Sequence, residues 1–256
     1  MSIVHGLAKS IGGFLFVTLL GLAILSIALA NLTDYANLKG PITDLFAATM
    51  TVQSNTNQSN QSAEILDGLK SECMRLGSPT INQSIDNTSM TLNCTEINTI
   101  ESSDVYKLVA GSFVDQIYHT DYNCSYIDCL QSNMSFESKV MVALISNKAH
   151  EFYISIIIYL LVIAALGGIM LAWGAGSVPG ALKSFGWSFV VIGMGYFFLT
   201  PIGSIIPAPA EAQAAISSLL KPLFTVMSQY FLYSLVAGIV ILSAGYGMKF
   251  LTKRKK

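Results

Sequence analysis

Four long apolar runs constrain this chain more than any other feature of its sequence. They contain no Asp, Glu, Lys or Arg, and they cover residues 11–30, 152–173, 185–206 and 227–248. A membrane's hydrocarbon core takes about 20 apolar helical residues to cross, so each run is long enough. Because a backbone in hydrocarbon must satisfy its own hydrogen bonds, the runs are expected to be helices. The sequence therefore predicts an all-α membrane protein with four transmembrane helices.

A soluble protein with four buried core helices is the alternative to this interpretation. Hydrophobic residues make up 52% of the chain and charged residues only 11%, about half the charged share that is usual in soluble domains. Four core helices of this length would leave almost no polar surface on so small a protein. The composition therefore favours the membrane interpretation.

The segment between the first two runs, residues 31–151, has a different composition. It contains all 12 Asn, all 4 Cys and 14 of the 15 acidic residues. Apolar residues recur there at helical spacing after Pro41, Ser62 and Ser103. We expect a large, mostly helical domain with exposed loops at 51–62 and 77–102. The spacing also predicts that 135–173 forms one continuous helix leading into the second span.

The four cysteines of this segment predict two disulfides that staple the domain. They are Cys73, Cys94, Cys124 and Cys129. An even number of cysteines on one side of a membrane is typical of an oxidising compartment. Metal binding is the alternative, but the closest pair is separated by four residues and does not match a zinc pattern. Three disulfide connectivities are possible, and the spacing does not choose between them.

Glycosylation motifs of the form Asn-x-Ser/Thr are concentrated in the same segment. Eight Asn residues begin such a motif, and Asn31 among them lies too close to the first span to be a good acceptor. The expected acceptors are Asn57, Asn60, Asn82, Asn87, Asn93, Asn123 and Asn133. A hydrophilic loop rich in Asn and Ser would give some of these matches by chance. Their number favours a glycosylated domain outside the cytosol.

The basic residues predict which side of the membrane each segment occupies. The N-terminus, the 174–184 linker and the C-terminal tail together contain seven Lys or Arg and no acidic residue. Cytoplasmic segments retain Lys and Arg, so both termini are expected in the cytosol and 31–151 outside it. The first run also resembles a cleavable signal peptide, but its length favours a retained anchor.

These considerations give one expected layout. The segments are a cytoplasmic N-terminus (1–10), transmembrane helix 1 (11–30), the extracytoplasmic glycosylated domain (31–151), transmembrane helix 2 (152–173), a cytoplasmic linker (174–184), transmembrane helix 3 (185–206), an extracytoplasmic interfacial loop (207–226), transmembrane helix 4 (227–248) and a basic cytoplasmic tail (249–256). Within 207–226, apolar residues before Pro222 fall on one helical face, which is typical of a short interfacial helix.

Small residues within the spans predict where helices pack together. Such residues let two backbones approach closely, and the motif serves both contacts within one chain and contacts between copies. The expected packing residues are Ala164, Gly168, Gly193, Gly195, Gly245 and Gly247.

The residue pattern favours a non-enzymatic function. His5, His119 and His150 are scattered, and no familiar catalytic or phosphate-binding motif is present. We therefore expect no catalytic residue, no metal and no cofactor. The expected partners are the lipid bilayer and either further copies of the chain or other surface proteins, and not nucleic acid. The hypothesis is a cell-surface or envelope glycoprotein that mediates assembly, adhesion or recognition; the alternative is a homo-oligomeric channel lined by uncharged spans.

Overall fold

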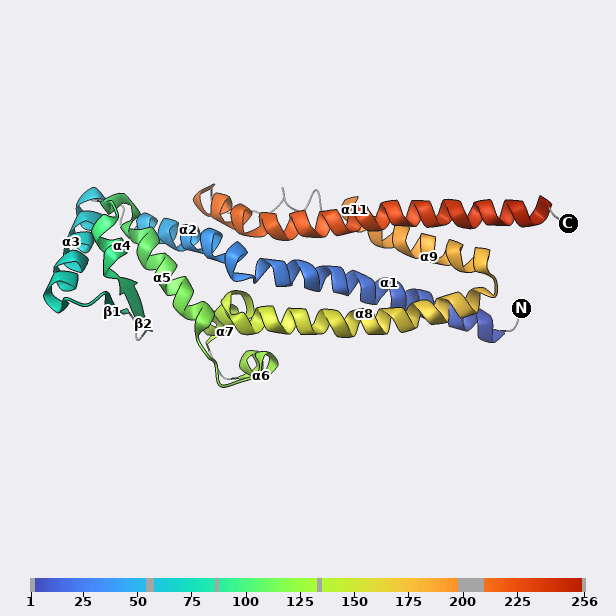
Figure 1. The fold of residues 1–256 in the computed structure, drawn as a ribbon, viewed down its shortest axis with the longest axis horizontal. Helices are drawn as coiled ribbons and strands as arrows, with labels where there is room; N and C mark the ends of the chain where they lie inside the picture. Colours follow the sequence, from blue (N-terminus) through green and yellow to red (C-terminus); the bar gives the residue numbers. More distant parts are fainter. Residues whose placement is uncertain (1–2, 54–57, 86–87, 133–134, 198–209, 255–256) are drawn as a thin grey trace. The chain divides into compact units, whose positions relative to one another are not determined.

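The chain divides into two compact units. Figure 1 shows the helices and strands that they contain. The computed structural model describes residues 3–53, 58–85, 88–132, 135–197 and 210–254. The span unit comprises residues 1–32, 150–206 and 220–256, and the disulfide unit comprises residues 33–149 and 207–219. Both units are mostly helical, as the sequence predicts.

Long apolar helices make up the span unit. They are α1 (Ile3–Leu32), α8 (Asn147–Ala175), α9 (Val178–Gly193) and α11 (Ala210–Arg254). Within the residues that the structure describes, three segments are long and apolar enough to cross a membrane, namely Ile3–Leu32, Asn147–Ala175 and Leu220–Phe250. Many of their large side chains are exposed, such as Ile158 and Ile169. Apolar surface of this extent is costly in water and suits contact with lipid.

The predicted third span, 185–206, lies partly outside the described residues. Residues 185–193 belong to α9, which has 16 residues, and residues 198–206 are not described. The expected linker 174–184 is much shorter in the structure, because α9 already begins at Val178. Gly176 ends α8 with a positive φ of 64°, a conformation that favours glycine. Ser177 then caps α9 by accepting a hydrogen bond from the Gly180 backbone N–H.

The region expected to be an interfacial loop, 207–226, is helical from Ala210 onward. It belongs to α11, a single helix of 45 residues that contains Pro222. A separate helix ending before Pro222 is therefore wrong. The residues before the proline are rich in Ala and Leu, which are strong helix formers. A proline within a helix removes one backbone hydrogen bond and does not always end the helix.

Nine elements lie wholly within the described part of the disulfide unit, to which residues 210–219 of α11 also belong. They are α2 (Tyr35–Gln53), α3 (Gln58–Leu76), β1 (Thr80–Ile85), β2 (Thr88–Asn93), α4 (Cys94–Thr99), the 3-10 turn η1 (Ser102–Asp104), α5 (Val105–His119), α6 (Tyr126–Gln131) and α7 (Phe136–Ile145). Helix α2 starts earlier than the sequence suggests, so that Pro41 lies inside it. Helix α3 likewise begins at Gln58, within the expected loop 51–62.

The expectation of an exposed loop over 77–102 is wrong. This stretch forms the β1–β2 hairpin and helix α4, with strands paired antiparallel from Thr80↔Asn93 to Ile85↔Thr88. Ile81, Met90 and Leu92 are each no more than 2% exposed. Large apolar residues are sparse here, but in an extended strand alternate residues point to the same side. A few apolar residues are therefore sufficient to give the hairpin one buried face.

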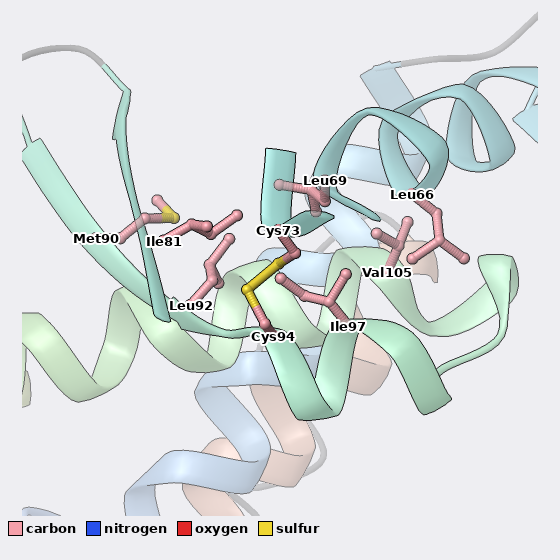
Figure 2. Packing of buried hydrophobic residues seen from close by; sticks show 9 residues of the cluster. All are labelled: Leu66, Leu69, Cys73, Ile81, Met90, Leu92, Cys94, Ile97 and Val105. Carbon is pink, nitrogen blue, oxygen red and sulfur yellow. A yellow bond between two sulfur atoms is a disulfide. The ribbon is translucent and has the colours of Figure 1, made fainter. Parts of the chain in front are cut away.

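The hairpin closes the larger of two hydrophobic cores in this unit (Figure 2). Its buried side chains come from α3, both strands, α4 and the start of α5, and Figure 2 shows them around the Cys73–Cys94 bridge. The second core joins α2, α5 and α7. It contains Leu38, Ile42, Val114, Ile117, Tyr118 and Ile145.

The expected continuous helix over 135–173 is interrupted at Ser146. Helix α7 ends at Ile145 and α8 begins at Asn147. The Ser146 hydroxyl donates to the Val142 carbonyl and accepts from the Ala149 N–H, at 3.2 Å in the second case. Serine side chains compete with backbone groups for hydrogen bonds, and this favours helix starts over helix interiors. The physical cause of the break is therefore this serine.

Candidate functional site

A polar groove lies between helices α2 and α5 of the disulfide unit, with α4 contributing at one side. Its volume is about 520 Å³. Charged side chains line it from all three helices. They are Lys39 and Asp44 of α2, Glu96 of α4, and Lys107 and Asp115 of α5. Three acidic and two basic groups therefore gather in one concave surface.

The best-defined part of the groove is a cluster of Tyr35, Lys39 and Asp115. The Tyr35 hydroxyl donates a short hydrogen bond to one carboxylate oxygen of Asp115. The Lys39 ammonium donates to the Tyr35 hydroxyl at 3.0 Å and to the other Asp115 oxygen at 2.9 Å. Residues four apart on a helix share a face, so α2 presents Tyr35 and Lys39 together. Hydrogen bonds to Tyr35 and then to Asp115 raise the pKa of Lys39 above its usual value of 10.5.

Further along the groove the contacts are looser. Lys107 and Asp44 are 4.0 Å apart, and both side chains are more than half exposed. Between the two charged pairs, the Thr43 hydroxyl oxygen is buried and has no hydrogen-bond partner among the described residues. It faces Gly111, where an added Cβ would lie 3.8 Å from that oxygen. Leaving a buried hydroxyl without a partner costs about 1–3 kcal/mol.

The groove offers charged and hydrogen-bonding groups for recognition. Here the strong contacts join an acid, a base and a phenol into a closed cluster. A partner with its own charges and hydrogen-bonding groups could form ion pairs and hydrogen bonds with the side chains of this cluster. The arrangement suits binding of a polar partner.

The predicted disulfide residues form two pairs. Cys73 of α3 is bonded to Cys94 of α4, with Cα atoms 5.7 Å apart. Cys124 is bonded to Cys129 of α6, with Cα atoms 5.4 Å apart. The structure thus selects one of the three connectivities that the spacing left open. Both pairs lie within the disulfide unit.

The predicted glycosylation sites are placed only in part. Asn82, Asn93 and Asn123 are exposed. Asn57, Asn87 and Asn133 lie outside the described residues, and for Asn60 only the helical backbone is described. Asn93 also caps α4, because its side chain accepts from the Thr95 N–H at 2.9 Å. Two of the motifs, at Asn93 and Asn123, have a disulfide cysteine as their middle residue.

Most of the predicted packing residues lie at helix contacts of the span unit. Ala164 is 3% exposed. A Cβ at Gly168 would lie 3.2 Å from Phe185, and one at Gly195 would lie 3.2 Å from Phe231. A Cβ at Gly193 would lie 2.6 Å from Leu235, and a Cβ at Gly245 would lie 3.1 Å from Leu182. Gly247 differs, because an added Cβ would meet nothing within 4 Å in the described chain.

Several of the closest helix contacts involve glycines that the sequence reasoning did not select. A Cβ at Gly12 would lie 2.6 Å from the Leu171 backbone nitrogen, which joins α1 to α8. Cβ atoms at Gly186 and Gly238 would lie 2.8 Å and 2.7 Å from backbone nitrogens of the facing helix, which joins α9 to α11. Ser234 adds a hydrogen bond of 3.1 Å to the Phe189 carbonyl. A search for any glycine within an apolar run would have found all three positions.

The histidines occupy three separate places. His5 stacks on Trp173 with ring centroids 5.0 Å apart. His119 packs near the Tyr35 and Tyr118 rings at 5.3 and 5.2 Å. The His150 ring is 2.9 Å from the Ala30 carbonyl oxygen. Each histidine therefore contacts its own neighbours, and the structure does not bring the three together.

The Tyr35–Lys39–Asp115 cluster was missed by sequence reasoning. Tyr35 and Asp115 are 80 positions apart, and a single sequence contains no signal for such a contact. The i, i+4 spacing of Tyr35 and Lys39 was the one visible hint. Comparison with protein families, with curated proteins and with solved structures gives no match to this chain, so the function has to be argued from the site.

Proposed function

We propose that this chain is a non-enzymatic, multi-pass glycoprotein of the cell surface or envelope, whose disulfide unit mediates assembly, adhesion or recognition. The observation that carries the proposal is the charged groove between α2 and α5. It combines five charged side chains with a buried, unpartnered threonine hydroxyl. Such a surface suits a protein partner with complementary charges, either a second copy of the chain or another surface protein.

The membrane layout in this proposal has four spans, both termini in the cytosol and the disulfide unit outside. The three long apolar helices support a multi-pass protein. The one-sided distribution of acidic residues, cysteines and glycosylation motifs supports the orientation. Tags fused at residues 1 and 256 of the full chain should resist protease added to intact cells. Digestion of a C-terminal tag from outside would contradict the four-span layout.

The binding role is tested by altering the groove without altering its shape. Lys39→Met and Asp115→Asn remove the charges of the central pair and keep similar side-chain volumes. We expect these variants to lose the oligomer, or the cross-linked partner, that the full-length protein forms in mild detergent. Arg75→Gln with Glu72→Gln is the matched control, because this exposed pair on α3 lies outside the groove. Equal loss in the control and groove variants would contradict the groove's role.

The same preparation separates recognition from the alternative of a channel. A protein that acts through the disulfide unit should give silent planar bilayers when reconstituted alone. Single-channel currents that disappear on mutation of Ser188 or Ser243 would support uncharged spans as a pore lining and overturn the present proposal.

A further inference from the structure

A second pocket lies in the span unit, at the end where α8 passes into α9. Its volume is about 500 Å³. Polar and aromatic side chains from three helices line it: Lys9 and Ser10 of α1, Lys183, Ser184 and Trp187 of α9, and Tyr246 of α11. Two ammonium groups and three hydroxyl groups, that of Tyr246 included, therefore share one pocket. All of them are hydrogen-bond donors.

None of the described residues that line this pocket carries a carboxylate to balance its two lysines. The span unit contains a single acidic side chain, Glu151. Glu151 and the pocket residue Leu171 are 20 positions apart on α8, which is about 30 Å at 1.5 Å per residue. The cavity is therefore an uncompensated cationic site.

Tight helix packing and an aromatic ring hold the two lysines in place. Lys183 lies over the Tyr246 ring with its nitrogen 3.9 Å from the ring centroid, within the range of a cation–π contact. The α9 backbone at Lys183 also lies close to α11, because a Cβ added at Gly245 would be 3.1 Å from the Lys183 backbone nitrogen. On the other side, α8 approaches the α1 backbone at Lys9 through Gly174. Helix packing therefore fixes the backbone positions of Lys9 and Lys183 at the pocket wall.

The pocket is also lined by a Trp and a Tyr, the residue types that prefer the level where lipid headgroups meet acyl chains. Trp and Tyr prefer this interface, because one part of each ring system is apolar and another is polar. Trp187 and Tyr246 are both exposed, and Trp173 stacks on His5 at the same end of the unit. Beyond Lys183 and Lys9 the helices α9 and α1 continue as apolar sequence. Basic pockets between spans at this depth bind anionic lipid headgroups.

We propose that this pocket binds the headgroup phosphate of an anionic phospholipid. Lys9 and Lys183 neutralise the phosphate, and Ser10 donates a hydrogen bond to one of its oxygens. The Ser184 hydroxyl lines the same pocket but donates to the Gly180 carbonyl at 3.1 Å. Trp187 and Tyr246 pack against the glycerol and upper acyl chain. A phosphatidylcholine headgroup fits less well, since its own ammonium would be placed beside the two lysines. This site is independent of the α2–α5 groove, so either proposal can fail without the other.

The test compares two pairs of lysines in the full-length protein. Lys9→Gln with Lys183→Gln removes both pocket charges, and Lys253→Gln with Lys255→Gln removes two charges from the tail. The protein is purified in mild detergent, phosphatidylglycerol or phosphatidylcholine is added, and bound lipid is counted by native mass spectrometry. The wild-type protein should retain phosphatidylglycerol in preference to phosphatidylcholine. The pocket pair should lower the apparent phosphatidylglycerol affinity roughly tenfold or more, and the tail pair should change it by less than about threefold.

Two further arms identify what the pocket recognises. Lys9→Arg with Lys183→Arg keeps the charge and should keep lipid binding, which separates loss of charge from loss of folding. Inorganic phosphate at millimolar concentration should compete weakly with phosphatidylglycerol, because it lacks the glycerol and acyl contacts. Equal losses in the pocket and tail variants would overturn the site in favour of diffuse surface attraction. Binding of inorganic phosphate as tight as that of the lipid would overturn a lipid site in favour of a small-anion site.

Discussion

In the span unit, helices approach one another most closely at glycines, which have no side chain. In the disulfide unit, helices contact one another through interlocking side chains. Gly193 faces the α11 backbone at Leu235, while Leu92 and Ile97 fill a core around a covalent bridge. Lipid is as apolar as a leucine side chain, so burying leucine between spans gains little. In water the same burial contributes about 1.5–3 kcal/mol per large side chain. The solvent therefore determines which contacts stabilise each unit.

The largest expected effect comes from the longer disulfide. Cys73→Ser with Cys94→Ser should destabilise the disulfide unit by about 3 kcal/mol, because the bridge closes a long loop of the unfolded chain. The separation is 21 residues for this pair and 5 for Cys124–Cys129. Loss of the shorter bridge should therefore cost less, about 2 kcal/mol. Hydrogen exchange of the full-length protein reports the two units separately.

The contrast between the units predicts where that cost appears. Exchange should accelerate in α3, the hairpin and α4, and stay unchanged in α1 and α9. If the Cys73–Cys94 variant also loosened the spans, the two units would not be stabilised independently.

The next largest effect comes from filling a glycine contact between α9 and α11. Gly193→Leu places a side chain where a Cβ alone would lie 2.6 Å from Leu235. Overpacking of this kind costs about 1–3 kcal/mol, since a backbone cannot move aside as a side chain can. Thermal denaturation in detergent should show the loss. Gly247→Leu is the matched control, because its Cβ would meet nothing within 4 Å of the described chain, and it should leave the midpoint unchanged.

A smaller effect is expected from pH, and it should be confined to the disulfide unit. The pKa of Lys39 is raised by its hydrogen bonds to Tyr35 and Asp115, so folding favours the protonated form. The resulting stabilisation is complete below pH 10.5 and is lost as the pH rises above that value. Both partners are about 40% exposed, at 42% for Lys39 and 39% for Asp115, which limits the effect to about 1 kcal/mol or less.

A second group in the same unit titrates in the same direction. Burial raises the pKa of Tyr122 above its usual value of 10.0, so its ionisation also destabilises the folded form at high pH. The contribution of Lys39 is therefore the difference in denaturation midpoint between the wild type and Lys39→Met. That difference should shrink between pH 9 and pH 12; a constant difference would contradict the assignment.

The smallest effect is expected at a hydrogen bond between α9 and α11. Ser234→Ala removes the hydrogen bond to the Phe189 carbonyl. Hydrogen bonds between spans contribute about 0.6 kcal/mol on average. The midpoint in detergent should fall slightly, and by much less than for Gly193→Leu. A loss as large as that of Gly193→Leu would show that hydrogen bonds stabilise the span unit as much as close packing at glycines does.

The two units also differ in how far their structure follows from the sequence. An apolar run of 20 residues has one stable solution in a membrane, so the first, second and last spans were readable from composition. The hairpin over 80–93 was not, because its burial depends on Ile81, Met90 and Leu92 in a stretch rich in Asn, Ser and Thr. The break at Ser146 rests on one side-chain hydrogen bond that no periodicity reveals.

The candidate sites also differ in how much of each could be predicted from the sequence. The number of cysteines was enough to predict two disulfides. Which cysteine is bonded to which could be seen only in the structure. The groove depends on contacts such as Tyr35 to Asp115, which join α2 to α5 across 80 positions. The pocket proposed to bind lipid gathers residues from α1, α9 and α11. Sites assembled from distant segments become visible only after the helices are placed.

The bridge from Cys73 to Cys94 has a consequence for how the protein responds to proteases. The two cysteines enclose the whole hairpin, because β1 and β2 lie between them in the chain. A cut anywhere in that stretch leaves both fragments joined through sulfur. The nicked protein would therefore migrate as one species under denaturing conditions and separate into two only after reduction. Non-reducing electrophoresis alone would record such a molecule as intact.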